Sequence, residues 1–104
     1  MIILVTGSAG FTGQALVAQL QATGHRVTGI DIDPEQLSNI FIQHDLTKPL
    51  KKKVIAEVVI HLGSAVRGFL LNVDEKLIKI NDQINHNVLE ICRASGCHHS
   101  VEKD

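Results

Sequence analysis

The chain has 104 residues, of which 44% are hydrophobic and 20% charged, a composition that suits one globular domain and not two. Ten basic and eleven acidic residues give a formal net charge of −1, so we expect no basic surface for nucleic acid. The first apolar run, residues 1–5, is too short to span a membrane, and no charged segment precedes it as in a signal peptide. Two cysteines are too few to define a disulfide framework, so we expect a cytoplasmic, reduced protein.

Short apolar runs alternate along the chain with longer segments of helical periodicity. The apolar runs predict strands at residues 2–5, 26–30, 39–43 and 57–62, and residues 98–104 are expected to begin a fifth strand. Pro34 is expected to start a short turn or helix. Residues 48–53 are expected to form a charged linker with little regular structure. This alternation predicts an α/β fold with a parallel sheet and helices on both faces.

Two segments have the periodicity of helices. The first is expected to end near Gly24, and its apolar side to carry Phe11, Ala15, Leu16, Ala18 and Leu20. The second runs over residues 74–95 and ends at Gly96, with apolar residues every three to four positions at Leu77, Ile80, Ile84, Val88 and Ile91.

A glycine-rich loop joins the first strand to the first helix, with the spacing G-x-x-G-x-x-G. In a dinucleotide site of the Rossmann type, Gly7 would permit the tight turn, Gly10 would let a pyrophosphate approach the backbone, and Gly13 would bring the helix close to the sheet. The backbone N–H groups of Phe11 and Thr12 would then face the phosphates. Alone, such a loop is a weak signal, because glycine loops also serve as structural turns.

Asp31 lies at the end of the second strand, about 20 residues beyond the loop, where a carboxylate can accept both hydroxyls of an adenosine ribose. The same carboxylate would repel a 2′-phosphate. Ile32 and Asp33 follow it, with no arginine or lysine close by. If Asp31 contacts the ribose, the sequence favours NAD over NADP. The alternative is that Asp31 is a solvated residue of a turn.

Four further landmarks follow in order, at residues 45–47 (Asp-Leu-Thr), 59–64 (Val-Ile-His-Leu-Gly-Ser), 81–90 and 93–97. With the glycine loop they resemble the extended short-chain dehydrogenase/reductases, the NAD-dependent epimerase/dehydratase family. The resemblance implies that Asp45 and Leu46 cover the adenine, and that Leu62, Gly63 and Ser64 line the side of the nicotinamide ribose. Within 81–90, the matching residues are Asn81, Asn87, Leu89 and Glu90, and Asn81 is implied to brace the helix against the sheet.

The chain departs from the family pattern at several positions. Thr12 replaces an aliphatic residue, and Gly63-Ser64 replaces Ala-Ala, which keeps the volume small. Ile84 and Asn85 stand where the family usually has Gly and Thr, so the packing of the long helix is expected to differ.

The largest departure is that the family's catalytic machinery is missing from these residues. The resemblance places a catalytic Ser/Thr, a Tyr-x-x-x-Lys motif and a sugar-binding domain after strand five, and this chain has no tyrosine at all. We therefore expect residues 1–104 to form a single NAD(P)-binding Rossmann half-domain, truncated after about strand five, with no catalytic residue of its own. Full-length relatives are implied to act on nucleotide sugars, with a proton-transfer machinery that this chain lacks.

Other chemistry has less support from the residues. His61 is better interpreted as a satisfied strand-end histidine than as a functional one. Cys92 and Cys97 with His98-His99 do not have a usual zinc spacing, so no metal site is expected. Ser64 has no evident base partner for nucleophilic catalysis.

Two alternatives stay open beside the NAD-binding hypothesis. In the first, the half-domain is a non-catalytic interaction or assembly module, with its open sheet edge covered by a second copy or by a partner chain. In the second, it is a truncated gene product with little function.

Overall fold

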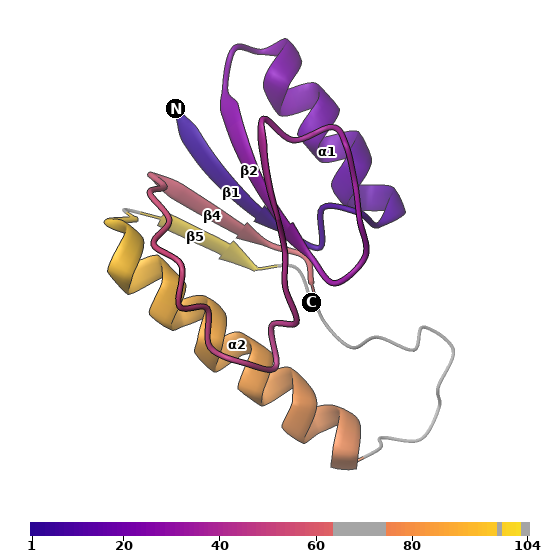
Figure 1. The fold of residues 1–104 in the computed structure, drawn as a ribbon, viewed down its shortest axis with the longest axis vertical. Helices are drawn as coiled ribbons and strands as arrows, with labels where there is room; N and C mark the ends of the chain where they lie inside the picture. Colours follow the sequence, from indigo (N-terminus) through magenta and orange to yellow (C-terminus); the bar gives the residue numbers. More distant parts are fainter. Residues whose placement is uncertain (64–74, 98, 103–104) are drawn as a thin grey trace.

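The computed structural model describes residues 1–63, 75–97 and 99–102. Five parallel strands form one sheet in the order β3-β2-β1-β4-β5, which confirms the predicted α/β fold of the Rossmann type (Figure 1). The strands are β1 (Ile2–Thr6), β2 (Arg26–Asp31), β3 (Ile40–Gln43), β4 (Val58–His61) and β5 (His99–Glu102). The helices are α1 (Phe11–Ala22) and α2 (Glu75–Ser95).

The register of the sheet aligns the carboxyl ends of its central strands. β1 pairs with β2 on one side, where Thr6 is opposite Ile30, and with β4 on the other, where Thr6 is opposite His61. Because all the strands are parallel, the segments that follow them emerge at the same edge of the sheet. That edge carries the glycine loop, Asp31 and the segment that follows His61.

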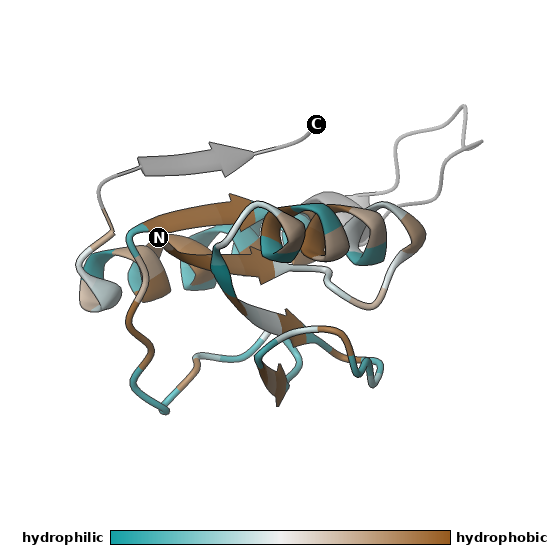
Figure 2. Cartoon of the chain, turned by 90° about the horizontal axis from the view of Figure 1, so that it is seen from above, coloured by the Kyte–Doolittle hydropathy of each residue, from teal (hydrophilic) through white to brown (hydrophobic). Residues whose placement is uncertain are grey.

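The two helices cover opposite faces of the sheet, as predicted, and each face has its own core. Successive residues of β1 alternate between the faces, with Ile3 and Val5 on the α1 side and Leu4 on the α2 side. The α1 face also contains Val17, Val27 and flanking residues of α1 and β4. The α2 face is larger, because an irregular segment from 44 to 57 packs on it beside the helix. The hydrophobic colour in Figure 2 concentrates on the strands between these layers.

The predicted apolar side of α1 is partly wrong. Phe11 is 95% exposed, and Ala15 and Ala18 are exposed as well, whereas the residues facing the sheet are Gly13, Leu16, Val17 and Leu20. These four follow the i, i+3, i+4, i+7 pattern of one helical face, about one residue out of phase with the predicted side. In α2, Ile84, Val88 and Ile91 are buried as predicted, whereas Ile80 is 37% exposed.

The connections after β2 and β3 contain no helix in the described part of the chain. Residues 32–39 follow Asp31 as bends and irregular backbone, so neither the hydrogen-bonded turn nor the helix expected at Pro34 is found. Residues 48–53 have little regular structure, as predicted. Asn87 of α2 donates a hydrogen bond to the backbone oxygen of Leu46 at 2.8 Å, which ties the second connection to the helix. Neither described helix is long and apolar enough to cross a membrane.

Candidate functional site

A crevice opens at the carboxyl edge of the sheet, beside the point where the strand order reverses. The chain leaves β1 towards β2 and β3, and later returns to β4 on the other side of β1. In open α/β sheets, ligands bind at such a switch point. The cavity measures about 530 Å³ and is lined by Gly7, Gly10, Asp31, Ile32, Asp33, His44, Asp45, Leu46, Thr47, Leu62, Gly63, Ile80 and Ile84.

The structure brings together most of the residues that the sequence proposed for the cofactor. Those that line the cavity are Gly7, Gly10, Asp31, Ile32, Asp45, Leu46, Leu62 and Gly63. Phe11, Thr12 and Gly13 lie in the first turn of α1 and do not line it, and Ser64 lies outside the described residues. Asp33, His44 and Thr47 also line the cavity and were not predicted to, although they adjoin predicted residues. Ile80 and Ile84 line it too, although the sequence indicated them only as apolar positions of the long helix.

The three glycines of the loop differ in whether the structure requires a residue without a side chain. Gly7 has a φ of +72°, and a Cβ there would lie 2.8 Å from the backbone nitrogen of Gly63. A Cβ on Gly13 would lie 2.0 Å from the backbone oxygen of Gly7, so the loop and α1 could not keep their contact. A Cβ on Gly10 would meet only the Gly7 oxygen, at an ordinary 3.5 Å. The described chain therefore needs glycine at 7 and 13 but not at 10, where a bare backbone faces the cavity.

The first turn of α1 supplies unpaired N–H donors beside that bare backbone. Gly10 is the N-cap and provides no side-chain cap, and the first helical bond runs from the Gln14 N–H to the Gly10 oxygen at 2.8 Å. The N–H groups of Phe11, Thr12 and Gly13 come before it and have no acceptor within the helix. With the helix dipole, such donors favour an anion.

Asp31 connects the loop to the end of β2. One carboxylate oxygen accepts the N–H of Ala9 and the other accepts the N–H of Asp33, both at 2.9 Å. A carboxylate oxygen has two lone pairs, so each can still accept a hydroxyl from a ligand. Asp31 thus helps to hold the loop as well as facing the cavity, a role that the sequence did not indicate.

Asp45, which follows β3, has a stable negative charge in the lining of the crevice. Its Oδ1 accepts hydrogen bonds from the Thr47 hydroxyl at 2.7 Å and from the Thr47 N–H at 2.9 Å. These two bonds hold the pKa of Asp45 below its ordinary value of 3.8. Asp45 is therefore ionised near neutral pH and can accept a hydrogen bond from an amino or hydroxyl group.

The end of β4 is held by a side-chain network around the buried His61. The Thr6 Oγ1 atom lies 2.5 Å from Nδ1 of His61, and Nε2 of His61 lies 2.9 Å from Oδ1 of Asn85 on α2. His61 is 5% exposed and both of its nitrogens have partners. His61 is thus satisfied at the end of its strand, as expected, and its partners come from two other elements.

Beneath the loop, Ser8 has an unusual environment. Its side chain is fully buried, and Oγ has no hydrogen-bond partner among the described residues. A Cβ on Gly29 of β2 would lie 2.5 Å from this oxygen and 2.4 Å from Oγ of Ser38. The bare backbone of β2 at Gly29 therefore makes room for both serines on the α1 side of the sheet.

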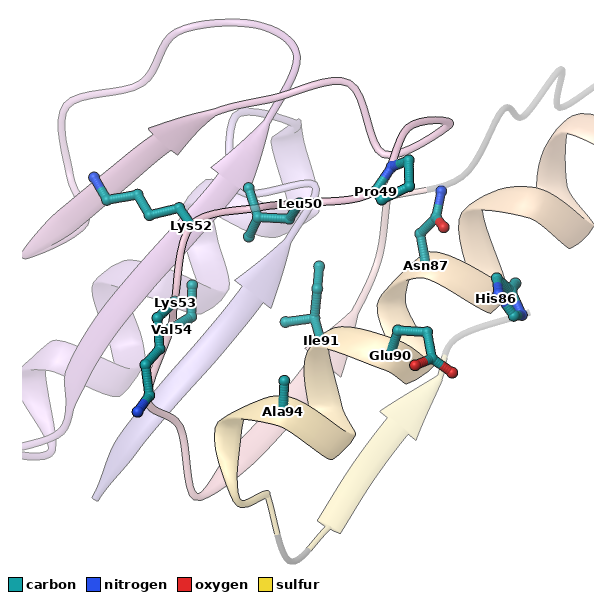
Figure 3. A pocket seen from close by; sticks show the side chains of 10 residues that line it. All are labelled: Pro49, Leu50, Lys52, Lys53, Val54, His86, Asn87, Glu90, Ile91 and Ala94. Carbon is teal, nitrogen blue, oxygen red and sulfur yellow. The ribbon is translucent and has the colours of Figure 1, made fainter.

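A second hollow lies between α2 and the segment that precedes β4 (Figure 3). It measures about 270 Å³ and is lined by Pro49, Leu50, Lys52, Lys53, Val54, His86, Asn87, Glu90, Ile91 and Ala94. Figure 3 shows the charged ends of Lys52 and Lys53 pointing away from α2. Ligand sites usually have converging polar groups, so we place the candidate site at the crevice.

Comparison with known proteins decides between a general Rossmann fold and a particular family. The sequence model described as "NAD dependent epimerase/dehydratase family" matches residues 3–102. The chain belongs to this family. The resemblance identified from the glycine loop and the later landmarks is thus confirmed, although no curated protein matches the sequence significantly.

Solved structures of epimerases and related enzymes have the same fold. A UDP-galactose 4-epimerase is 26% identical with a TM-score of 0.84, over 98% of this chain and 37% of its own. A short-chain dehydrogenase/reductase superfamily protein from Agrobacterium tumefaciens with bound NAD is 27% identical, with a TM-score of 0.80, over 98% and 32%. MoeE5, in complex with UDP-glucuronic acid and NAD, is 26% identical with a TM-score of 0.74, over 98% and 36%. This member of the epimerase/dehydratase family therefore spans about a third of the length of these proteins.

Proposed function

We propose that the crevice binds NAD, and that the chain is the cofactor-binding part of an epimerase/dehydratase acting on nucleotide sugars. The observation that carries the proposal is Gly10. No contact within the described chain requires a glycine there, yet its bare backbone faces the cavity beside the uncapped N-terminus of α1. A phosphate group that must approach the backbone closely explains that choice of residue. Two of the solved relatives are described as complexes with NAD.

The cavity has the order of groups that an extended dinucleotide needs. Asp45 and Leu46 would contact the adenine, and Asp31 would accept the hydroxyls of its ribose. The glycine loop would hold the pyrophosphate in the middle. Leu62 and Gly63 follow β4, on the other side of β1 from Asp31, and would contact the nicotinamide ribose. When bound, NAD supplies hydride acceptance and donation, which no side chain can provide.

Charge at the adenosine end favours NAD over NADP. Asp31 and Asp33 both line the cavity there. A 2′-phosphate would lie beside two carboxylates, and repulsion between like charges weakens binding. The described residues lining this part of the cavity include no arginine or lysine to offset that repulsion.

These 104 residues contain no tyrosine, the proton-transferring residue that the family resemblance implies. We therefore propose that the chain binds the cofactor without turning over a nucleotide sugar by itself. The proton-transfer groups and the sugar site would have to be supplied by other residues.

Calorimetric titration of the chain with NAD and with NADP tests the proposal. We expect NAD to bind more tightly than NADP, and the Asp31→Ala variant to lose much of that preference, because it lacks the carboxylate that repels the 2′-phosphate. NAD at about 100 times its Kd should also raise the free energy of unfolding by about 2.7 kcal/mol. The ratio of the two affinities is the informative quantity, since Asp31 also holds the loop and its loss affects both ligands.

Asp82→Ala is the matched control. Asp82 is an exposed carboxylate on α2 and does not line the cavity, so its removal changes the net charge by the same amount. We expect this variant to keep the NAD preference of the wild type. A folded wild-type chain that binds neither nucleotide would show the proposal to be wrong.

A further inference from the structure

The hydrogen bonds around Thr6 determine which nitrogen of His61 carries a proton. The Oγ1 atom of Thr6 accepts the N–H of Leu62 and the N–H of Gly63, each at 3.0 Å. The Leu62 N–H is shared with the backbone oxygen of Thr6 at 3.1 Å. A hydroxyl oxygen has two lone pairs, and both are engaged by these donors. The remaining contact, to Nδ1 of His61, must then be donated by the hydroxyl.

Nδ1 of His61 is therefore an acceptor without a proton, and the ring proton is on Nε2. That N–H donates to Oδ1 of Asn85 at 2.9 Å. A single chain of hydrogen bonds thus runs from Asn85 on α2 through His61 and Thr6 to the two N–H groups that follow β4. It joins three elements at the switch point of the sheet.

This chain of bonds ends at the floor of the crevice. The Gly63 N–H held by Thr6 is the atom that a Cβ on Gly7 would approach to 2.8 Å, so the loop and the end of β4 are in backbone contact there. Leu62 and Gly63 line the cavity, and so does Ile84, the neighbour of Asn85. A change at Asn85 can therefore alter the crevice without touching the adenosine end.

We infer that His61 and Asn85 are positioning residues for the nicotinamide half of the dinucleotide. The inference rests on the proposed function. They act through Thr6, whose hydroxyl holds Leu62 and Gly63 where that half of NAD would lie. The contact with His61 comes from the amide oxygen of Asn85.

The test compares NAD with ADP, which shares only the adenosine and pyrophosphate groups. Asn85 is exposed on α2, so Asn85→Ala removes the acceptor and leaves the core intact. We expect NAD affinity to fall by about three- to tenfold, the effect of one hydrogen bond, while ADP affinity stays unchanged. Asn85→Asp keeps an acceptor oxygen and should restore the ratio of the two affinities. Gln83→Ala, at an exposed position on the same helix, should leave the ratio as in the wild type.

A long-range ¹H–¹⁵N correlation spectrum of the His61 ring gives a readout that needs no ligand. We expect the Nε2–H tautomer in the wild type and in Asn85→Asp, and a loss of that single tautomer in Asn85→Ala. A wild-type spectrum with the Nδ1–H tautomer overturns the inference, as does an unchanged NAD-to-ADP ratio in Asn85→Ala. If the wild type binds ADP and NAD but Asn85→Ala does not alter their ratio, only the inference fails. If the wild type binds neither, the proposed function fails and the positioning role fails with it.

Discussion

Replacement of Gly10 by alanine should separate ligand binding from folding. The backbone there has φ −72° and ψ 168°, which alanine adopts without strain, and the added Cβ would have its nearest neighbour at 3.5 Å. Alanine is a poorer N-cap than glycine, but it also restricts the unfolded chain, by about 0.4–1 kcal/mol. The free energy of unfolding should therefore change by less than about 1 kcal/mol.

NAD binding should respond very differently to the same methyl group. In the proposed complex the pyrophosphate lies against the backbone at Gly10, so the methyl must displace it or distort the loop. Steric insertion of this kind costs about 1–3 kcal/mol, which corresponds to a loss of affinity of about fivefold to more than a hundredfold. The structure thus predicts a folded variant that binds NAD poorly.

Gly13→Ala provides the contrasting case. Its Cβ would lie 2.0 Å from the Gly7 oxygen, so α1 would have to move away from the loop. We expect destabilisation of about 3 kcal/mol or more, a large part of the total of about 5–15 kcal/mol usual for a domain of this size. Urea denaturation and calorimetry on the two variants measure both effects. A Gly10→Ala protein with wild-type NAD affinity, or a Gly13→Ala protein with wild-type stability, would refute the reasoning.

Other variants test the environments of single side chains. Ser8→Ala removes a buried hydroxyl without a partner among the described residues, and urea denaturation should show a stability equal to or about 1 kcal/mol above that of the wild type; a marked loss would mean that the hydroxyl is satisfied. The hydrogen bonds from Thr47 lower the pKa of Asp45, so they contribute stability that is complete above the ordinary value of 3.8 and is lost as the pH falls through the lower folded value. Thr47→Val should accordingly be less stable than the wild type at pH 6 but not in strong acid, and a pH-independent difference would contradict this assignment. Burial and the neighbouring Cys97 thiol raise the pKa of Cys92 from 9.0 to about 11, so iodoacetamide should modify Cys92 about tenfold more slowly than an ordinary thiol, as followed by peptide mass mapping; rapid modification would show that the thiol is not held as described.

The sequence by itself determined the order of the elements and the position of the crevice-forming motifs. Strand runs, the glycine spacing and the residue at the end of the second strand are local patterns, and each reflects the backbone geometry of a few neighbouring residues. Asp31 and the glycine loop could therefore be assigned to one edge of the sheet from the residues alone. The buried side of α1 could not be predicted as reliably from the sequence, because Phe11, Ala15 and Ala18 are as apolar as the residues that are buried.

Only the tertiary structure decided which distant groups meet. Thr6 and His61 are neighbours because β1 and β4 pair in register, and Asn85 joins them because α2 packs on that face of the sheet. Asp31 holds the glycine loop, and Gly10 differs from Gly7 and Gly13, for reasons that appear only in the distances between atoms. Such contacts leave no periodic signal in the sequence, because they depend on strand register and helix packing, which the whole chain sets together.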